Sequence, residues 1–158
     1  METHNFERLK AHIMPMSHAS DFELASREWK LIGIEISEEF DQCPCGQDIK
    51  EHCYIQNQKT GRTTYVGNVC INRFLRIDTG NTFAGLRRIA KDDTANANLD
   101  LVQHAQRLGY LFDGEYEFLV STARKRKLSA KQLAWKQKIN RRITNKTVVK
   151  RRGEVPQE

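Results

Sequence analysis

The hydrophobic positions at the start of the chain change from an irregular spacing to a helical one and then to alternation. Residues 1–19 show no clear period and are expected to form a flexible arm. Apolar residues at helical intervals from Phe22 to Trp29 predict a short helix over residues 21–30. The alternating isoleucines of residues 31–37 then predict a strand.

The next segment has the pattern of a β-hairpin followed by a helix. Residues 49–56 and 62–66 are two extended runs, and a short loop ending in Gly61 separates them. A short glycine-containing loop between strand-like runs predicts a β-hairpin. The chain then turns at residues 67–68 into a helix that should end near Gly80. Three apolar residues mark the buried side of this helix: Ile71, Phe74 and Leu75.

The second half of the chain has helical spacing almost throughout. Three helices are predicted, the second closed by Gly109 and the third beginning after Gly114. Their apolar repeats are Phe83, Leu86 and Ile89; Leu99, Val102 and Leu108; and Tyr116, Leu119 and Ala123. A fourth helix should begin at Ser129, which has capping-box spacing with Gln132, and run to Ile143.

The composition is that of a globular protein rather than a membrane protein. Of the 158 residues, 39% are hydrophobic and 29% are charged, and no run approaches the roughly 18 apolar residues of a spanning helix. The polar N-terminus lacks the apolar core of a secretion signal, so we expect a cytoplasmic location, the bacterial nucleoid or the host cytoplasm, and no membrane partner. The four cysteines should be reduced there, and their clustering between residues 43 and 70 indicates a metal.

The cysteine spacing predicts one structural zinc ion. Cys43-Pro-Cys45-Gly46 has the form of a knuckle, in which glycine permits the tight backbone after the second sulfur. The hairpin follows, and Cys70 falls in the first turn of the next helix, where the helix dipole favours a thiolate. The order knuckle, hairpin, helix is the treble-clef arrangement. A metal-free set of buried cysteines is the alternative, and no nearby base completes a catalytic zinc signature.

The fourth zinc ligand is predicted at Cys53, with His52 as the alternative. These two residues are adjacent on a predicted strand, so their side chains point to opposite faces and only one can reach the ion. All-cysteine sites are common, which favours Cys53. The predicted ligands are therefore Cys43, Cys45, Cys53 and Cys70.

These signals predict an α+β protein with a treble-clef-like zinc hairpin–helix followed by a helical C-terminal half. Residues 20–143 should form a single compact domain, with the zinc module at about 38–77 and the helical part at about 81–143. Residues 144–158 should form a basic disordered tail.

Positive charge is concentrated near the C-terminus. The net charge is +6, but residues 1–120 hold 13 Lys/Arg and 18 Asp/Glu, or −5. Residues 121–152 hold 13 Lys/Arg and no acid, and the last six residues contribute −2. Such a segment attracts phosphate backbones, which favours binding to DNA or RNA. The alternatives are an acidic protein partner, the acidic body of the chain itself, and a solvated face that only maintains solubility.

Eight basic residues are predicted as nucleic-acid contacts because they form a dense run and then one edge of the last helix. They are Arg124, Lys125, Arg126, Lys127, Lys131, Lys138, Arg141 and Arg142. Trp29 and Trp135 could stack on bases, but both lie on helical apolar stripes and are expected in the core.

Several short motifs resemble those of a loose set of small phage, viral and bacterial proteins, many of them uncharacterised. They are Cys43-Pro-Cys-Gly-Gln-Asp-Ile49, Ile55-Gln-Asn57, Thr60-Gly61, Val66-Gly67, Cys70-Ile-Asn-Arg-Phe74, Glu115-Tyr-Glu-Phe118 and the run from Arg124 to Gln132. The resemblance covers residues 20–143. It implies a treble-clef-like zinc protein carried by a mobile element, and it brings no established activity.

The sequence favours a zinc-stabilised nucleic-acid-binding protein with an accessory or regulatory role and no catalysis. It contains no glycine-rich phosphate loop, nucleophile elbow or paired-carboxylate motif. One alternative is a small protein-interaction module that inhibits or adapts a larger complex, with zinc purely structural. A weaker alternative is a metal-dependent nuclease that would use His52 or Glu51.

Overall fold

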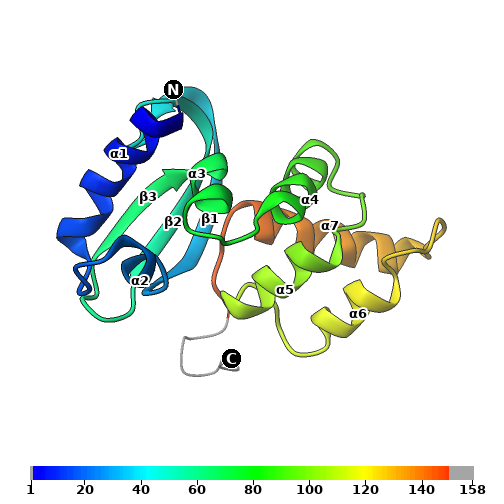
Figure 1. Ribbon diagram of the computed structural model, residues 1–158. Coiled ribbons are helices and arrows are strands. Elements are labelled where there is room, and N and C mark those ends of the chain that lie inside the picture. Colours follow the sequence, from blue (N-terminus) through cyan, green and yellow to red (C-terminus); the bar gives the residue numbers. More distant parts are fainter. Residues whose placement is uncertain (1, 150–158) are drawn as a thin grey trace. The chain divides into compact units, whose positions relative to one another are not determined.

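The chain divides into two compact units. The computed structural model describes residues 2–149, and the boundary between the units lies between Thr79 and Gly80. The N-terminal unit contains the sheet, and the C-terminal unit is helical (Figure 1). The α+β class is confirmed, because the described residues form a three-stranded antiparallel sheet and seven α-helices. The expectation of a single domain over residues 20–143 is corrected, since each unit buries its own apolar side chains.

The sheet consists of β1 (Trp29–Gln42), β2 (Asp48–Asn57) and β3 (Thr63–Gly67), paired in that order. β2 and β3 form the predicted hairpin. β1 begins earlier than expected, so the helix predicted over residues 21–30 shortens to α2 (Phe22–Ser26). The pairing with β2 continues to the end of β1, with irregular register, and long-range pairing of this kind cannot be read from local spacing.

The two faces of the sheet carry different side chains. On one face of β2 lie His52 and Tyr54, whose rings contact Tyr65 of β3. On the other face lies Cys53, which is opposite Val66 and fully buried. The strand alternation therefore separates His52 from Cys53, as the sequence predicts.

The expected flexible arm is instead largely helical. Helix α1 (Glu2–Ile13) continues into the short 3₁₀ helix η1 (Met14–Met16). Leu9 and Ile13, one helical turn apart, are fully buried, and His12 Nε2 lies 2.7 Å from the hydroxyl oxygen of Thr64 on β3. Figure 1 shows α1 lying along the sheet, so this segment belongs to the N-terminal unit.

The segment that follows η1 is held by the carboxylate of Glu28. This group accepts hydrogen bonds from the backbone N–H groups of His18 and Ala19 at 2.8 and 2.9 Å. It also accepts one from the side-chain amide of Asn57 at 3.0 Å. Burial opposes ionisation of Glu28, but these hydrogen bonds outweigh it, led by the one from Asn57, and lower the pKa of Glu28. The end of the N-terminal segment is thus tied to the β2–β3 turn.

The helical unit contains α4 (Gly80–Lys91), α5 (Leu99–Arg107), α6 (Glu115–Ser121) and α7 (Ala130–Thr144). Helix α4 packs against α5 and α7, and α5 also packs against α6. The fully or almost fully buried side chains of the helical unit include Phe83, Ile89, Leu101, Leu111, Ile139 and Ile143. Burial of this apolar surface is the main stabilising term of a small helical unit.

The predicted capping box of the last helix is confirmed. The hydroxyl of Ser129 accepts a hydrogen bond from the Gln132 N–H, and the Gln132 side chain accepts one from the Ser129 N–H. Most of the predicted tail, residues 150–158, lies outside the described residues. Within residues 2–149, none of the helices combines the length and the apolar character needed to cross a membrane.

Candidate metal centre and basic surface

Three of the four cysteines form a buried cluster. The Sγ atoms of Cys43, Cys45 and Cys70 all lie within 4.8 Å of one another, and we call these residues the three-cysteine cluster. Cys43 and Cys45 come from the turn between β1 and β2, and Cys70 comes from α3 (Asn68–Arg73). The structure therefore brings together residues 27 positions apart in the way the knuckle–hairpin–helix order predicts.

The local backbone of the knuckle directs its sulfurs inward. The Gly46 N–H donates to the Cys43 carbonyl at 2.7 Å, and Gly46 has a φ of 103°, a conformation that favours glycine. At the far side of the cluster, the Gly67 N–H donates to Cys43 Sγ at 3.2 Å. Backbone donors aimed at a sulfur stabilise its thiolate form.

Cys43 is the first of the three thiols to ionise. Its hydrogen bond with Cys70 lowers the pKa of Cys43 to about 6; burial opposes this shift, and the N–H groups of Cys45 and Gly67 assist it. The same interaction with Cys43 raises the pKa of Cys70. A thiolate at neutral pH is the form of cysteine that binds a metal.

The geometry of the cluster fits a metal ion. Two thiolates on a tetrahedral ion with bonds of about 2.3 Å lie about 3.8 Å apart. The Cys43 and Cys70 sulfurs are 3.6 Å apart. Soft sulfur donors select Zn, Cu(I) or iron–sulfur chemistry over Mg or Ca. The three residues could therefore hold a metal ion, and the geometry alone leaves the identity of that metal open.

Neither candidate for a fourth ligand belongs to the cluster. Cys53 is fully buried, and burial raises its pKa to about 12, so it remains a neutral thiol. His52 lies on the other face of β2, with Nε2 3.3 Å from a carboxylate oxygen of Asp41 and Nδ1 3.3 Å from the carbonyl oxygen of Lys50. Among residues 2–149, the group of potential ligands contains three cysteines and no fourth Cys, His or carboxylate.

The sequence missed a neighbour of the knuckle on α1. A Cβ added to Gly46 would collide with the guanidinium of Arg8. The guanidinium of Arg8 therefore lies against the turn of the knuckle. The helical spacing of Phe6, Leu9 and Ile13 is the sequence pattern that could have predicted this helix and its packing on the sheet. Arg8 lies on the same helix.

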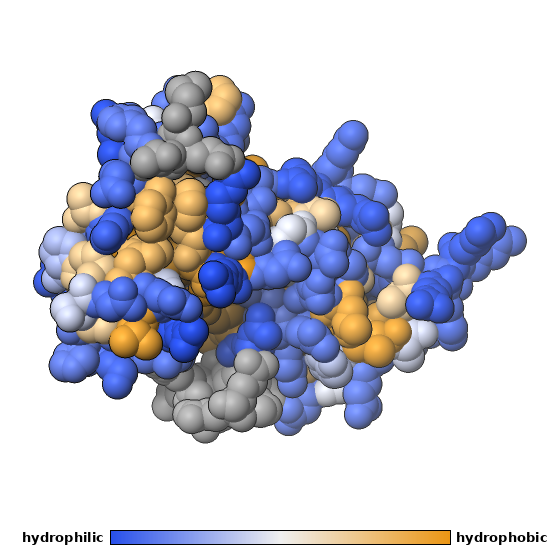
Figure 2. All heavy atoms as spheres, in the orientation of Figure 1, coloured by the Kyte–Doolittle hydropathy of each residue, from blue (hydrophilic) through white to orange (hydrophobic). Residues whose placement is uncertain are grey.

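Seven of the eight predicted nucleic-acid contacts are exposed, and six of these, all except Arg141, form no ion pair within the described residues. Arg124, Lys125, Arg126 and Lys127 lie in the loop between α6 and α7, which projects from the helices of its unit in Figure 1. Figure 2 shows this projection as one of the most hydrophilic parts of the face in view. The other two are Lys131 and Lys138, two turns apart on α7. We call these residues the six exposed cations.

None of the six exposed cations is neutralised by an acidic side chain in the part of the chain that the structure describes. The backbone of Lys125 is anchored instead, because its carbonyl accepts a hydrogen bond from Asn96 at 3.4 Å. The charged ends of these side chains are therefore available to an external anion.

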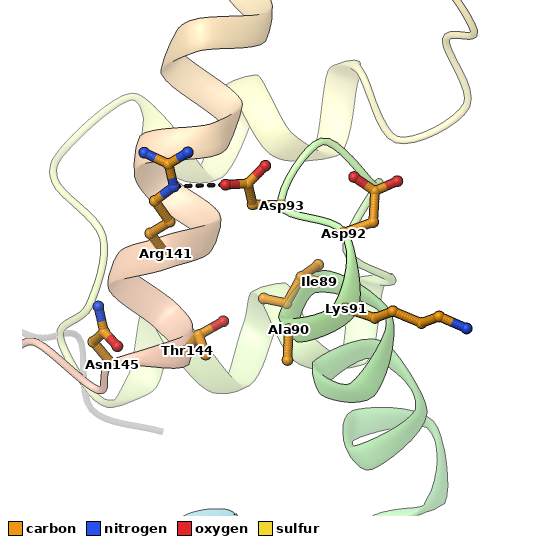
Figure 3. A pocket seen from close by; sticks show the side chains of 8 residues that line it. All are labelled: Ile89, Ala90, Lys91, Asp92, Asp93, Arg141, Thr144 and Asn145. Atoms are coloured by element: carbon orange, nitrogen blue, oxygen red, sulfur yellow. Dashed lines mark hydrogen bonds and ion pairs between the residues drawn. The ribbon is translucent and has the colours of Figure 1, made fainter.

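Arg141 and Arg142 differ from the six exposed cations because each forms an ion pair. Arg141 pairs with Asp93, with Nε 2.5 Å from Oδ2, beside a pocket of about 330 Å³ between the end of α4 and α7 (Figure 3). Arg142 is 9% exposed, and Nη1 lies 2.5 Å from a carboxylate oxygen of Glu115 and 3.0 Å from the carbonyl oxygen of Tyr110. Arg142 is therefore a core residue, and its prediction as a nucleic-acid contact is corrected.

Trp135 also departs from its predicted place, whereas Trp29 does not. Trp29 is buried, and its Nε1 donates to the hydroxyl of Ser17 at 3.0 Å. Trp135 is 39% exposed and stacks on Phe118 of α6, with ring centroids 4.1 Å apart and planes at 23°. An aromatic pair thus lies at the surface of the two helices that the basic loop connects.

Comparison of the chain with known protein families, with curated proteins and with solved structures found no significant match. The functional argument therefore rests on the three-cysteine cluster and the six exposed cations.

Proposed function

We propose that the protein is a zinc-stabilised nucleic-acid-binding protein with an accessory or regulatory role and no catalytic activity. The observation that carries this proposal is the group of six exposed cations, which no acidic partner neutralises within residues 2–149. Surface charges are normally interspersed with the opposite sign, and a one-sign surface attracts a ligand of the other sign. A nucleic-acid backbone supplies phosphates in a regular row, so it matches a loop and helix edge of this charge.

The charge distribution between the units supports the same interpretation. Residues 1–79 hold 9 Lys/Arg and 12 Asp/Glu, or 9 − 12 = −3. Residues 80–149 hold 14 Lys/Arg and 6 Asp/Glu, or 14 − 6 = +8. Phosphate contacts of this kind contribute affinity without sequence information, and they weaken steeply as salt rises. We expect binding to DNA or RNA with little sequence preference, in the nucleoid or the host cytoplasm.

In this proposal the metal is one zinc ion and its role is structural. The three-cysteine cluster takes two residues from the knuckle and one from α3, so a bound ion would link these two segments. Zinc is the common ion for sulfur-rich structural sites, and its binding free energy becomes folding free energy. The order of knuckle, β2–β3 hairpin and α3 supports a treble-clef-like arrangement. Because Cys53 lies outside the cluster, the proposed protein ligands are the three clustered cysteines.

Two variants of equal charge test the nucleic-acid proposal. The loop variant replaces Arg124, Lys125, Arg126 and Lys127 by glutamine. The control variant makes the same replacement at four cations of the N-terminal unit, Lys30, Lys50, Lys59 and Arg62, which are also exposed. Both variants lose four positive charges, and exposed substitutions leave folding nearly unchanged.

The assay is fluorescence anisotropy with labelled single-stranded DNA, duplex DNA and RNA at low salt. The loop variant should bind at least about tenfold more weakly than the wild-type protein, and the control variant should bind nearly as well. Equal losses in the two variants would show that only net charge matters. If the wild-type protein binds none of the three, the proposal is wrong and the acidic protein partner takes its place.

A further inference from the structure

Trp135 and Phe118 form an exposed aromatic pair between α7 and α6. The two rings are nearly parallel, with planes at 23° and centroids 4.1 Å apart, so Phe118 covers one face of the indole. Trp135 nevertheless remains 39% exposed. A tryptophan that served only as core would be buried, as Trp29 is at 4%. The uncovered part of the Trp135 ring is available to a ligand.

Two contacts, with Glu115 and with Phe118, fix the orientation of the Trp135 ring. Trp135 Nε1 donates to Oε2 of Glu115 at 3.2 Å. Glu115 is itself buried, and its other oxygen accepts hydrogen bonds from Arg142 and from the Phe112 N–H. The indole is therefore held by a hydrogen bond on its edge and by Phe118 on one face. A ring that is already immobilised loses little entropy when a flat ligand stacks on it.

Cations flank Trp135 on α7 and follow Phe118 in the loop after α6. Lys131 lies one turn before Trp135 and Lys138 lies nearly one turn after it, so both are neighbours of the indole on the helix surface. The loop that carries Arg124 to Lys127 begins shortly after α6, the helix of Phe118, and leads into α7. A flat apolar platform with cations around it matches a ligand that carries both flat rings and phosphates.

We propose that Trp135 and Phe118 form a base-stacking platform, which makes single-stranded nucleic acid the preferred ligand. This inference rests on the proposed function, because the six exposed cations must hold the phosphates on either side of the stacked base. An unpaired base offers its ring face, whereas the bases of a duplex are already covered by their neighbours. Stacking on aromatic side chains is also tolerant of sequence, in keeping with a site that has few groups to read base edges.

The native tryptophan fluorescence tests the platform directly. The protein has two tryptophans, and Trp29 is buried in the other unit. We would titrate the wild-type protein and Trp135→Phe with an oligothymidylate of about twelve nucleotides, which spans one site of typical size, and with the duplex of the same length. The oligothymidylate should quench the wild-type emission, the duplex should quench it much less, and the emission of Trp135→Phe should not change.

Affinity measurements separate stacking from charge. Trp135→Leu should weaken single-strand binding at least about fivefold and duplex binding little, since each stacked base contributes appreciable affinity. Leu133→Ala, a change at another exposed apolar residue of α7, should leave both affinities nearly unchanged and serves as the control. Anisotropy of the labelled strands gives these values at one salt concentration.

Each outcome supports or overturns a distinct statement. Binding with quenching and a loss confined to the single strand in Trp135→Leu supports the platform. Binding of wild-type protein without quenching, or with equal affinity for the two ligands, overturns the platform and leaves the proposed function standing. If the wild-type protein binds neither strand nor duplex at low salt, both fail.

Discussion

Replacing Arg142 by alanine should destabilise the helical unit by about 3–5 kcal/mol, whereas the same change at Arg141 should cost about 1 kcal/mol or less. The two residues are adjacent on α7, and the sequence predicts both as nucleic-acid contacts. Their environments differ, because the Arg142 side chain is 8% exposed and the Arg141 side chain is 66% exposed. Alanine favours the helix slightly and equally at the two positions, so this contribution cancels.

The larger loss of stability expected for Arg142→Ala follows from the buried groups that Arg142 contacts. Its Nη1 lies 2.5 Å from Oε1 of Glu115, a carboxylate whose side chain is 5% exposed. The same nitrogen donates to the carbonyl of Tyr110 at 3.0 Å, and the guanidinium lies 4.9 Å from the centre of the Phe112 ring. Removing the cation leaves the Glu115 carboxylate buried without an opposite charge and the Tyr110 carbonyl without this hydrogen bond. Breaking a buried pair by removing one partner is strongly destabilising for this reason. At Arg141 the partner Asp93 can turn to water instead.

Urea unfolding followed by far-UV circular dichroism measures the difference. For a unit of this size each kcal/mol corresponds to about 4–8 °C in melting temperature, so a thermal scan should separate the variants as well. Equal losses at the two positions, or a loss below about 1 kcal/mol for Arg142→Ala, would refute the burial argument. A loss well above that of Arg141→Ala would confirm that Arg142 supports the fold.

Three further predictions concern the metal, a close helix contact and a buried histidine. Cys70→Ser should abolish metal binding and destabilise the N-terminal unit, as a chelator should in the wild-type protein. Cys53→Ser should retain the metal, because Cys53 lies outside the three-cysteine cluster. Metal analysis measures retention, and thermal scans measure stability. Gly85→Ala should destabilise the helical unit in thermal scans although alanine favours helices, because a Cβ there would lie 2.7 Å from Oδ1 of Asn98, the N-cap of α5. Burial, assisted by a nearby arginine, lowers the pKa of His104 from 6.5 to about 4. The unfolded chain therefore binds the proton first, so urea titrations should show about 3 kcal/mol lost between pH 6.5 and 4, and less in His104→Leu.

Local signals in the sequence were sufficient where neighbours in the chain define the structure. The capping box of Ser129 and Gln132 and the hairpin before α3 depend on contacts a few residues apart. The knuckle around Cys43 could also be predicted, because two sulfurs and a glycine lie within four residues. These features account for the α+β class and for the three clustered cysteines among the four ligands predicted from the sequence.

The remaining features depend on partners far away in the chain. On a helical projection Arg142 falls on the same edge as Lys131 and Lys138, and only the carboxylate of Glu115, 27 residues earlier, shows that this position is buried. Strand alternation predicts that His52 and Cys53 lie on opposite faces of β2. Whether either side chain joins the three-cysteine cluster depends on how the knuckle folds over the sheet, and neither does. Tertiary packing decides both.

The salt dependence of single-strand binding tests the central claim most directly. Each phosphate neutralised on a single strand contributes about −0.7 to the slope of log K against log salt, so six contacts predict a slope of about −4. Replacing the four cations of the basic loop by glutamine should reduce that slope to about −1.4, while the matched control variant of the N-terminal unit should retain it. A slope near zero in the wild-type protein, or the same slope in all three proteins, would contradict phosphate binding by the six exposed cations.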